Sequence, residues 1–190
     1  MSPVARERTV GDRIRELRAV RGISIRKLAT RTDFSASFIS QVENGQASPS
    51  IGSLERLADA LGVTLGEFFA PAEHRGVQSL IVKAGSRQQL TSSWSNAQVD
   101  ALAPMGGDRR LEPVLMTLEP GGRSGSRPHP HLMEEFAYVI EGEVRLTLGD
   151  EQHLLGAGDA ATIPAEQARV WENAGGAPAR ILVVASRFPR

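Results

Sequence analysis

The sequence predicts a multidomain α + β protein in which a helical N-terminal domain is followed by a β-barrel or β-sandwich. Between Val10 and Phe69, apolar residues recur at the three- and four-residue spacing of amphipathic helices. From Ser79 onward they fall in short β-rich runs, most of them separated by turns that contain Gly, Pro or Asp. We interpret the polar segment between the two regions as a linker. The expected parts are a flexible arm at 1–9, a helical domain at 10–70, a linker at 71–76 and a β domain at 77–190.

The amino-acid composition excludes several classes of protein and of chemical site. The 190 residues include 22 basic and 22 acidic side chains, so the formal net charge is zero, and the apolar share of 41% is that of a globular protein. The lack of cysteine excludes disulfides, thiolate nucleophiles and cysteine-ligated zinc or iron–sulfur sites. No apolar run reaches the roughly 18 residues of a membrane-spanning helix, and the polar N-terminus has no apolar signal core. We expect a cytoplasmic protein with no membrane partner.

The helical domain is expected to contain five short helices. Ser24, Ser35 and Ser50 each precede an apolar-periodic stretch, which is typical of helix N-caps. Four such stretches are followed by a fifth turn after Gly62. Their periodic apolar positions are Val10, Ile14 and Leu17; Ile25, Leu28 and Ala29; Phe38, Ile39 and Val42; and Ile51, Leu54, Leu57, Ala58 and Leu61.

Two of these helices form a helix-turn-helix. Residues 24–31 and 35–44 are joined by the short turn 32–34, and in this arrangement the second helix can enter the major groove of DNA. Asp33 stands where such a turn often has Gly, but Asp tolerates the left-handed conformation. The outward positions of the second helix are small or hydrogen-bonding, as base readout requires: Ser35, Ala36, Ser37, Ser40 and Gln41.

Local charge supports a nucleic-acid partner. Residues 1–31 contain nine basic and three acidic side chains, an excess that the neutral total conceals. Such a cluster, which includes Arg26, is typical of phosphate contact and implies an affinity for double-stranded DNA that falls as salt rises.

The motifs of this region, taken in order, resemble the XRE family of lambda-repressor-like DNA-binding domains. The resemblance implies a five-helix domain with a buried ion pair between Arg18 and Glu43. It also puts Asn44 in a segment whose backbone approaches phosphate, and Ala36, Ser37 and Gln41 at base-facing positions. The matching segments are Ile-Arg-Glu-Leu-Arg at 14–18, Lys-Leu-Ala at 27–29, Ile-Ser-Gln-Val-Glu-Asn-Gly at 39–45, Pro-Ser at 49–50 and Leu-Ala-Asp-Ala-Leu-Gly-Val at 57–63.

Short strands predict the C-terminal fold. Their regular spacing, with turn residues between most of them, is typical of a β-sandwich or barrel, here of about 110 residues. The expected strands lie at 79–83, 113–118, 135–140, 143–148, 160–163 and 180–185.

One segment of this domain carries side chains that bind metals. His129, His131 and Glu135 share parity, so in an extended chain they face the same side. Two imidazoles and a carboxylate that converge in this way suit a divalent ion such as zinc, iron, manganese or nickel. We treat these three residues as candidate metal ligands.

The same segment resembles the first motif of the cupins, a family of jelly-roll barrels. Where the second cupin motif carries its remaining metal-ligand His, this chain has Arg169, and Glu166 replaces a glycine of that motif. A guanidinium cannot ligate a metal and would repel one, so the full four-ligand site is absent. Other positions do match the second motif, namely Gly158, Pro164 and Asn173.

Three interpretations of the cupin-like motif stay open. The candidate ligands could still hold a metal with open coordination positions. Alternatively, Arg169 could replace the metal's charge and pair with Glu135 or with an effector carboxylate. In the third interpretation the motif is polar lining that has lost its chemistry. The candidate effector contacts are Arg169, Glu135, Tyr138 and Trp171.

The two domains in this order resemble a class of bacterial one-component transcription regulators. That resemblance implies a barrel that binds a small-molecule effector and forms a homodimer, which sets the spacing of two DNA-binding domains on half-sites about 34 Å apart. We expect such a regulator, with no catalytic residues. The alternative is a cupin metalloenzyme of dioxygenase or isomerase type fused to a DNA-binding domain, and a third possibility is an adaptor that no longer binds DNA.

Overall fold

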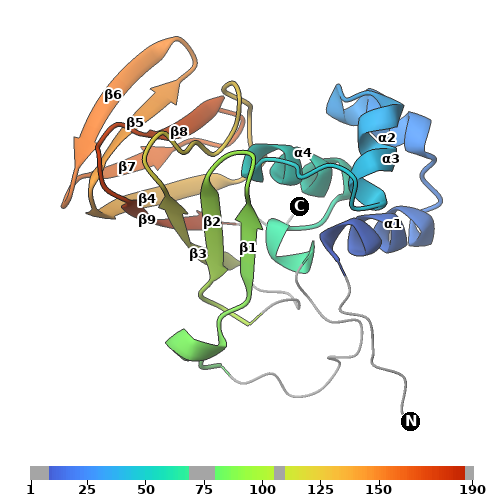
Figure 1. The fold of residues 1–190 in the computed structure, drawn as a ribbon, viewed down its shortest axis with the longest axis horizontal. Coiled ribbons are helices and arrows are strands. Elements are labelled where there is room, and N and C mark those ends of the chain that lie inside the picture. The colour runs from blue at the N-terminus through green and yellow to red at the C-terminus, as the bar shows by residue number, and fades with distance from the viewer. Residues whose placement is uncertain (1–8, 69–79, 105–109, 187–190) are drawn as a thin grey trace.

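The computed structural model describes residues 9–68, 80–104 and 110–186. The expected arm lies outside these ranges except for Thr9, and the expected linker lies entirely outside them. Helices occupy the N-terminal part and two β-sheets the C-terminal part, as Figure 1 shows. The predicted α + β class is confirmed.

The N-terminal part contains four α-helices that begin at hydroxyl side chains. Thr9, Ser24, Ser35 and Ser50 each accept a hydrogen bond from a backbone N–H of the first turn, which satisfies a donor that the helix itself leaves free. The three predicted serine N-caps are therefore confirmed. Among the described residues, no helix has the length and apolar character needed to cross a membrane. The helices are α1 (Val10–Val20), α2 (Ile25–Thr32), α3 (Ala36–Glu43) and α4 (Ile51–Leu61).

The prediction of a fifth helix is wrong. Leu65–Phe68 form a single 3-10 turn, η1. Gly62 ends α4 in a left-handed conformation with φ 65°, and Pro71 follows after only eight residues of sequence. Gly62 separates this turn from α4, and the described residues after it contain one 3-10 turn in place of the expected α-helix.

Two predicted details of the helix-turn-helix are confirmed. Asp33 caps the end of α2 in the left-handed region, with φ 53°. Arg18 and Glu43 form an ion pair in which Nε and Nη2 lie 2.6 and 2.8 Å from the two carboxylate oxygens. The hydrogen bond to Glu43 raises the pKa of Arg18 above its ordinary value despite partial burial. This pair joins α1 to α3, the second helix of the motif.

Two antiparallel sheets form the C-terminal part. One has the strand order β1-β2-β3-β9-β4-β7 and the other the order β6-β5-β8, and such a pair of packed sheets is the architecture of a jelly roll. The strands are β1 (Gln89–Ser92), β2 (Ala97–Ala101), β3 (Leu111–Leu118), β4 (Glu134–Glu141), β5 (Glu143–Leu148), β6 (Glu151–Gly156), β7 (Ala160–Ile163), β8 (Arg169–Asn173) and β9 (Ala179–Ser186).

Five of the six expected strands are confirmed, and the prediction of a strand at 79–83 is wrong. Its described residues, 80–83, precede a short 3-10 turn, η2 (Ala84–Ser86), and the first strand starts at Gln89. Leu80 and Ile81 are exposed. Among the described residues, 80–83 belong to neither of the two sheets.

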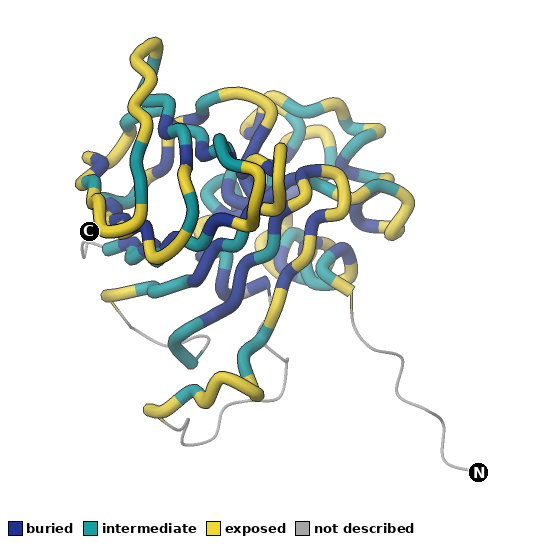
Figure 2. Tube along the Cα trace, turned by 60° about the vertical axis from the view of Figure 1, so that its left-hand side comes forward, coloured by how far each residue is buried: buried dark blue, intermediate teal, exposed yellow. Residues whose placement is uncertain are grey.

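Strand parity decides which side chains enter the barrel. On β4, Glu135 and every second residue to Val139 are buried, whereas the residues between them are exposed. On β8, Arg169 and Trp171 are buried on one face. Because alternate residues of a strand share a face, Glu135 and Arg169 point into the interior from different sheets. Figure 2 shows the buried stretches gathered along these inner strands.

Helix α4 packs directly against the barrel. In Figure 1 it lies between the sheets and the other three helices. The Gly52 N–H donates to the Ser124 carbonyl at 2.7 Å, and the Ser92 hydroxyl donates to the Pro49 carbonyl at 2.9 Å. A Cβ on Gly52 would lie 2.6 Å from Cε1 of His129, so only glycine permits this approach. The two domains are therefore in close contact through the last helix of the first.

Replacing Glu43 with Gln should strongly destabilise the helical domain. The change leaves the largely buried Arg18 guanidinium without its carboxylate, and we expect a loss of about 2–4 kcal/mol in the free energy of unfolding. The exposed pair Arg180–Glu141 gives a control, because Glu141→Gln should change stability by less than about 0.5 kcal/mol. Chemical denaturation followed by helical circular dichroism measures both. Equal losses in the two variants would contradict a structural role for the Arg18–Glu43 pair.

Candidate functional site

The predicted base-facing residues lie along one side of α3. Ser37, Gln41 and the N-cap Ser35 are exposed, whereas Ala36 and Ser40 are half-buried. Positions 37, 40 and 41 follow helical spacing, so these side chains share a face. The opposite face is buried through Ile39 and Val42. The exposed side of α3 is thus free to approach a ligand, and base contact by these residues stays a prediction.

Asn44 and Arg26 flank this face. Asn44 is exposed at the end of α3; its side-chain carbonyl accepts a hydrogen bond from Arg15, and its amide donates to the Ser40 hydroxyl at 3.4 Å. Arg26 is exposed on α2. Both side chains are exposed, and their role in phosphate binding stays a prediction.

The centre of the barrel is an ion pair between Arg169 and Glu135. Arg169 donates from Nε and Nη2 to the two oxygens of Glu135 at 2.6 and 2.5 Å. Both residues are buried, with Arg169 only 1% exposed. The sequence left three interpretations of this motif open. The structure contains the pairing of Arg169 with Glu135 that one of them includes.

A second carboxylate, Glu55, reaches Arg169 from the helical domain. Glu55 lies on α4, and its two oxygens accept hydrogen bonds from Nη1 and Nη2 of Arg169, both at 3.1 Å. The Nε2 atom of His129 lies 2.8 Å from the same carboxylate. A single guanidinium therefore joins a carboxylate of the barrel to a carboxylate of the helical domain.

Sequence analysis missed Glu55, although a signal was present. Glu55 lies on the same helical face as Ile51 and Ala58, which are buried. A charged residue on an apolar face needs a buried partner, because an unpaired charge is costly to bury. That partner, Arg169, lies more than a hundred residues away, so the sequence alone could not identify it.

Burial and neighbouring charges shift the pKa values of Glu55 and Arg169 in this cluster. Burial raises the pKa of Glu55, but the positive charge of Arg169 and the hydrogen bond with His129 outweigh burial and hold the pKa below its ordinary value. Burial lowers the pKa of Arg169, yet the charges of Glu135 and Glu55 raise it well above its ordinary value. Asp59, further along α4, behaves differently, because burial raises its pKa to about 6. The cluster is thus a guanidinium held between the carboxylates of Glu55 and Glu135.

A buried Glu/His/Glu group could hold a metal, but it differs from the predicted ligand set. Glu55, His131 and Glu135 offer ligand atoms that lie within 4.8 Å of one another. His129 is buried as well, yet its Nε2 is directed at Glu55. The difference arises because His129 contacts Glu55 and because α4 supplies a carboxylate to the group.

The donor set does not fit a resident metal ion. All four carboxylate oxygens of Glu55 and Glu135 accept hydrogen bonds from Arg169. The Nδ1 atom of His131 accepts one from the Met133 N–H at 3.2 Å. A divalent ion among these atoms would have to displace a guanidinium of the same charge sign.

The prediction that Tyr138 shares the effector site is wrong. Tyr138 is three residues from Glu135 on β4, so its side chain points to the opposite, outer face, where it is 40% exposed. Trp171 does face the interior, two residues from Arg169 on β8. Its ring N–H is buried and has no hydrogen-bond partner in the described part of the chain. Trp171 therefore offers a free donor beside the cluster.

Glu166 retains the turn that the family builds with glycine. Its φ is 66°, in the left-handed region that favours glycine. Its N–H donates to the His131 carbonyl at 2.7 Å, which holds the histidine segment next to β8. His129 forms an isolated bridge with Arg169 through N–H···O contacts of 3.2 and 3.0 Å. The backbone thus keeps the framework of a cupin site although its metal ligand is replaced.

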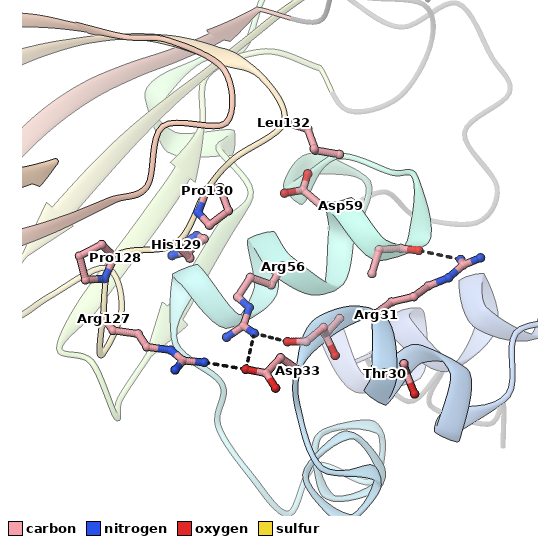
Figure 3. Close-up of a pocket in the computed structure, with 12 residues that line it drawn as sticks. Thr30, Arg31, Asp33, Arg56, Asp59, Arg127, Pro128, His129, Pro130 and Leu132 are labelled. Atoms are coloured by element: carbon pink, nitrogen blue, oxygen red, sulfur yellow. Dashed lines mark hydrogen bonds and ion pairs between the residues drawn. The ribbon is translucent and has the colours of Figure 1, made fainter. Parts of the chain in front are cut away.

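A cleft of about 770 Å³ opens between the two domains beside the cluster. Helices α2 and α4 line one side and the loop 127–132 lines the other (Figure 3). Arg127 of that loop pairs with Asp33 at the end of α2 at 2.9 Å. His129 also lines the cleft and contacts Glu55. The cleft therefore reaches the edge of the buried cluster from outside.

Comparison with known proteins assigns each half of the chain to a domain family. A model described as a helix-turn-helix domain matches residues 9–68, and a cupin domain model matches residues 114–185. A solved structure, an HTH_3 family transcriptional regulator from Vibrio cholerae, superimposes with a TM-score of 0.75 and covers 95% of this chain and 96% of its own. At 23% identity, that likeness shows the shared fold alone.

Sequence relatives span both domains. The HTH-type transcriptional regulator PuuR of Escherichia coli is 30% identical over 154 residues, which cover 80% of this chain and 81% of PuuR. The HTH-type transcriptional regulator SutR of Escherichia coli is 26% identical over 162 residues, 85% of each chain. The chain therefore belongs to the family of HTH-type transcriptional regulators that carry a C-terminal cupin domain.

Proposed function

We propose that this DNA-binding regulator responds to a small-molecule effector bound in its cupin barrel, at the cluster around Arg169. The observation that carries this proposal is the hydrogen bonding of Arg169 to Glu135 in the barrel and to Glu55 in the DNA-binding domain. A ligand that reorganises the cluster changes an interdomain contact. The unpartnered Trp171 N–H and the cleft beside His129 further support a ligand at this place. Because its partner is DNA, we assign the protein to the cytoplasm.

DNA recognition is proposed for the exposed side of α3. Ser35, Ser37 and Gln41 are the most accessible of its side chains, and the Gln41 amide is long enough to form two hydrogen bonds with an adenine edge. Arg26 is proposed to contact phosphate, where charge but not sequence is read. The two roles predict different responses to mutation.

Gln41→Ala should reduce specificity, and Arg26→Ala should reduce general affinity. We expect Gln41→Ala to weaken binding to a duplex selected by the wild-type protein by about 1–3 kcal/mol and to leave scrambled duplex unaffected. Arg26→Ala should weaken both duplexes alike and reduce the salt slope by about 1. Fluorescence anisotropy at several salt concentrations separates the two effects. Equal losses on both duplexes in the Gln41 variant would mean that another element reads the bases.

We further propose that the barrel works without a resident metal and without catalysis. Arg169 supplies the positive charge that a cupin metal would supply, and it occupies the oxygens of both glutamates. The metalloenzyme alternative needs open coordination positions on an ion held by His129, His131 and Glu135. His129 is directed at Glu55 instead, which leaves that set incomplete.

Removal of metal should leave the protein unchanged. After dialysis against a chelator, we expect the Tm to move by less than about 1 °C, because no ion contributes to the folded state. Elemental analysis of the purified protein should find no stoichiometric zinc, iron, manganese or nickel. A stoichiometric ion whose removal lowers the Tm would refute the metal-free site.

A homodimer is proposed through the outer face of the larger sheet. Phe136 and Tyr138 on β4 are 46% and 40% exposed, and they pair across to Val184 and Leu182 on β9. Val184 and Leu182 are half-buried, so apolar residues of two neighbouring strands share this face. A second copy is the occupant that fits, because two half-sites on DNA need a two-fold partner and an apolar patch of this kind marks an interaction surface.

Charges on this face should separate the dimer. Replacing Phe136 and Tyr138 with Asp places four carboxylates in the proposed interface, and we expect sedimentation to report a monomer. Leu154→Asp is the control, because Leu154 is an apolar residue that is 59% exposed but lies on β6 of the other sheet. A dimer that survives in the double variant, or one that the Leu154 variant loses, would place the interface elsewhere.

A further inference from the structure

Glu55 occupies the barrel in the way a small bound carboxylate would. Its side chain enters from another domain, both of its oxygens accept from one edge of Arg169, and His129 lies 2.8 Å from one of them. The carboxylate is buried, and its neighbour His129 lines the cleft between the domains. The barrel thus presents a built carboxylate site whose occupant belongs to the DNA-binding domain.

We propose that the effector is a small organic carboxylate and that its carboxylate replaces Glu55 on Arg169 and His129. This inference rests on the proposed function and names the chemical class of its ligand. Exchange of one carboxylate for another keeps the charge of the cluster constant. It therefore avoids the cost of leaving Arg169 without a partner in the interior.

The two edges of Arg169 are not equivalent. The edge that faces Glu135 has contacts of 2.5 and 2.6 Å, whereas the edge that faces Glu55 has contacts of 3.1 Å. Shorter charge-assisted bonds are the stronger ones. Glu135 belongs to the same barrel and stays, so Glu55 is the carboxylate that a ligand displaces. A cationic ligand would meet the guanidinium instead and has no comparable place at this edge.

Displacement of Glu55 loosens the contact between the domains. The hydrogen bond from Gly52 to Ser124 lies one turn before Glu55 on α4 and holds the same helix against the barrel. On its other side α4 contacts α2, where Arg56 donates to the Thr32 carbonyl. Release of α4 from the barrel therefore frees the helix-turn-helix as a unit. Because Glu55 is tethered, the effector needs further contacts to compete, and the free Trp171 N–H offers one.

Glu55→Ala tests the site with acetate as the probe. The variant removes the tethered carboxylate and leaves space beside Arg169. We expect sodium acetate to raise its Tm by a few degrees, whereas acetamide and sodium chloride at equal ionic strength do not. Wild-type protein and Glu151→Ala, which removes an exposed carboxylate on β6, should not respond to acetate.

A second variant keeps the test decisive if Glu55→Ala does not fold. Glu55→Gln keeps the size of the side chain but loses its charge, so acetate should stabilise it as well, though less than Glu55→Ala. Failure of acetate to stabilise either folded variant, or equal stabilisation by chloride, overturns the carboxylate site. Hydrogen exchange adds a readout of the helix: the Gly52 amide should exchange faster in Glu55→Ala than in wild type, with or without acetate. Unchanged exchange would show that Glu55 does not hold α4 on the barrel.

The link to DNA is measured separately. Relative to wild type, Glu55→Ala should change affinity for the selected duplex by about fivefold or more, and Glu151→Ala should leave it within about twofold. If wild-type protein selects no duplex, the proposed function fails, but the acetate experiment contains no DNA and still decides the site. If acetate has no effect while wild type binds its duplex, the function stands and the carboxylate inference fails.

Discussion

The rest of the structure depends on one buried guanidinium. Arg169 hydrogen-bonds to Glu135 in the barrel and to Glu55 on α4, so a single side chain both neutralises the interior and joins the two domains. Such a cluster contributes less through net stability than through specificity, because the cost of burying three charges offsets much of their attraction. The cluster constrains how the two domains pack, because α4 must lie where Glu55 reaches Arg169. Gly52 permits this close approach because it has no side chain.

The replacement of a metal ligand by arginine changes what the cupin framework can do. The backbone still brings His129 and β8 together, and Glu166 still adopts the conformation of the family's glycine. A divalent ion accepts ligands from several directions, whereas a guanidinium offers planar edges that match carboxylates. In this chain the framework pairs two carboxylates through Arg169, one from the barrel and one from α4.

Local signals allowed much of the fold to be predicted. Helix starts at Ser24, Ser35 and Ser50 depend on hydroxyl groups a few residues from their targets, and the left-handed Asp33 depends on its own backbone preference. Predictions failed where the conformation of a segment depends on residues that are distant in the sequence. Residues 80–83 form no strand in the described structure, although their apolar run predicted one. Tyr138 could have been placed correctly, since its odd separation from Glu135 already indicates the outer face.

The sequence by itself determined the two domain types, the positions of the helices around the turn at Asp33, and the presence of a cation, Arg169, where a metal ligand would stand. These properties follow from residue spacing and from chemistry carried by single side chains. Only the tertiary structure decided that Glu55 enters the barrel, that His129 turns toward it, and that a cleft leads to their contact. The reason is physical: a charge on a buried helical face requires a partner, but which partner depends on how two separately folded domains pack together.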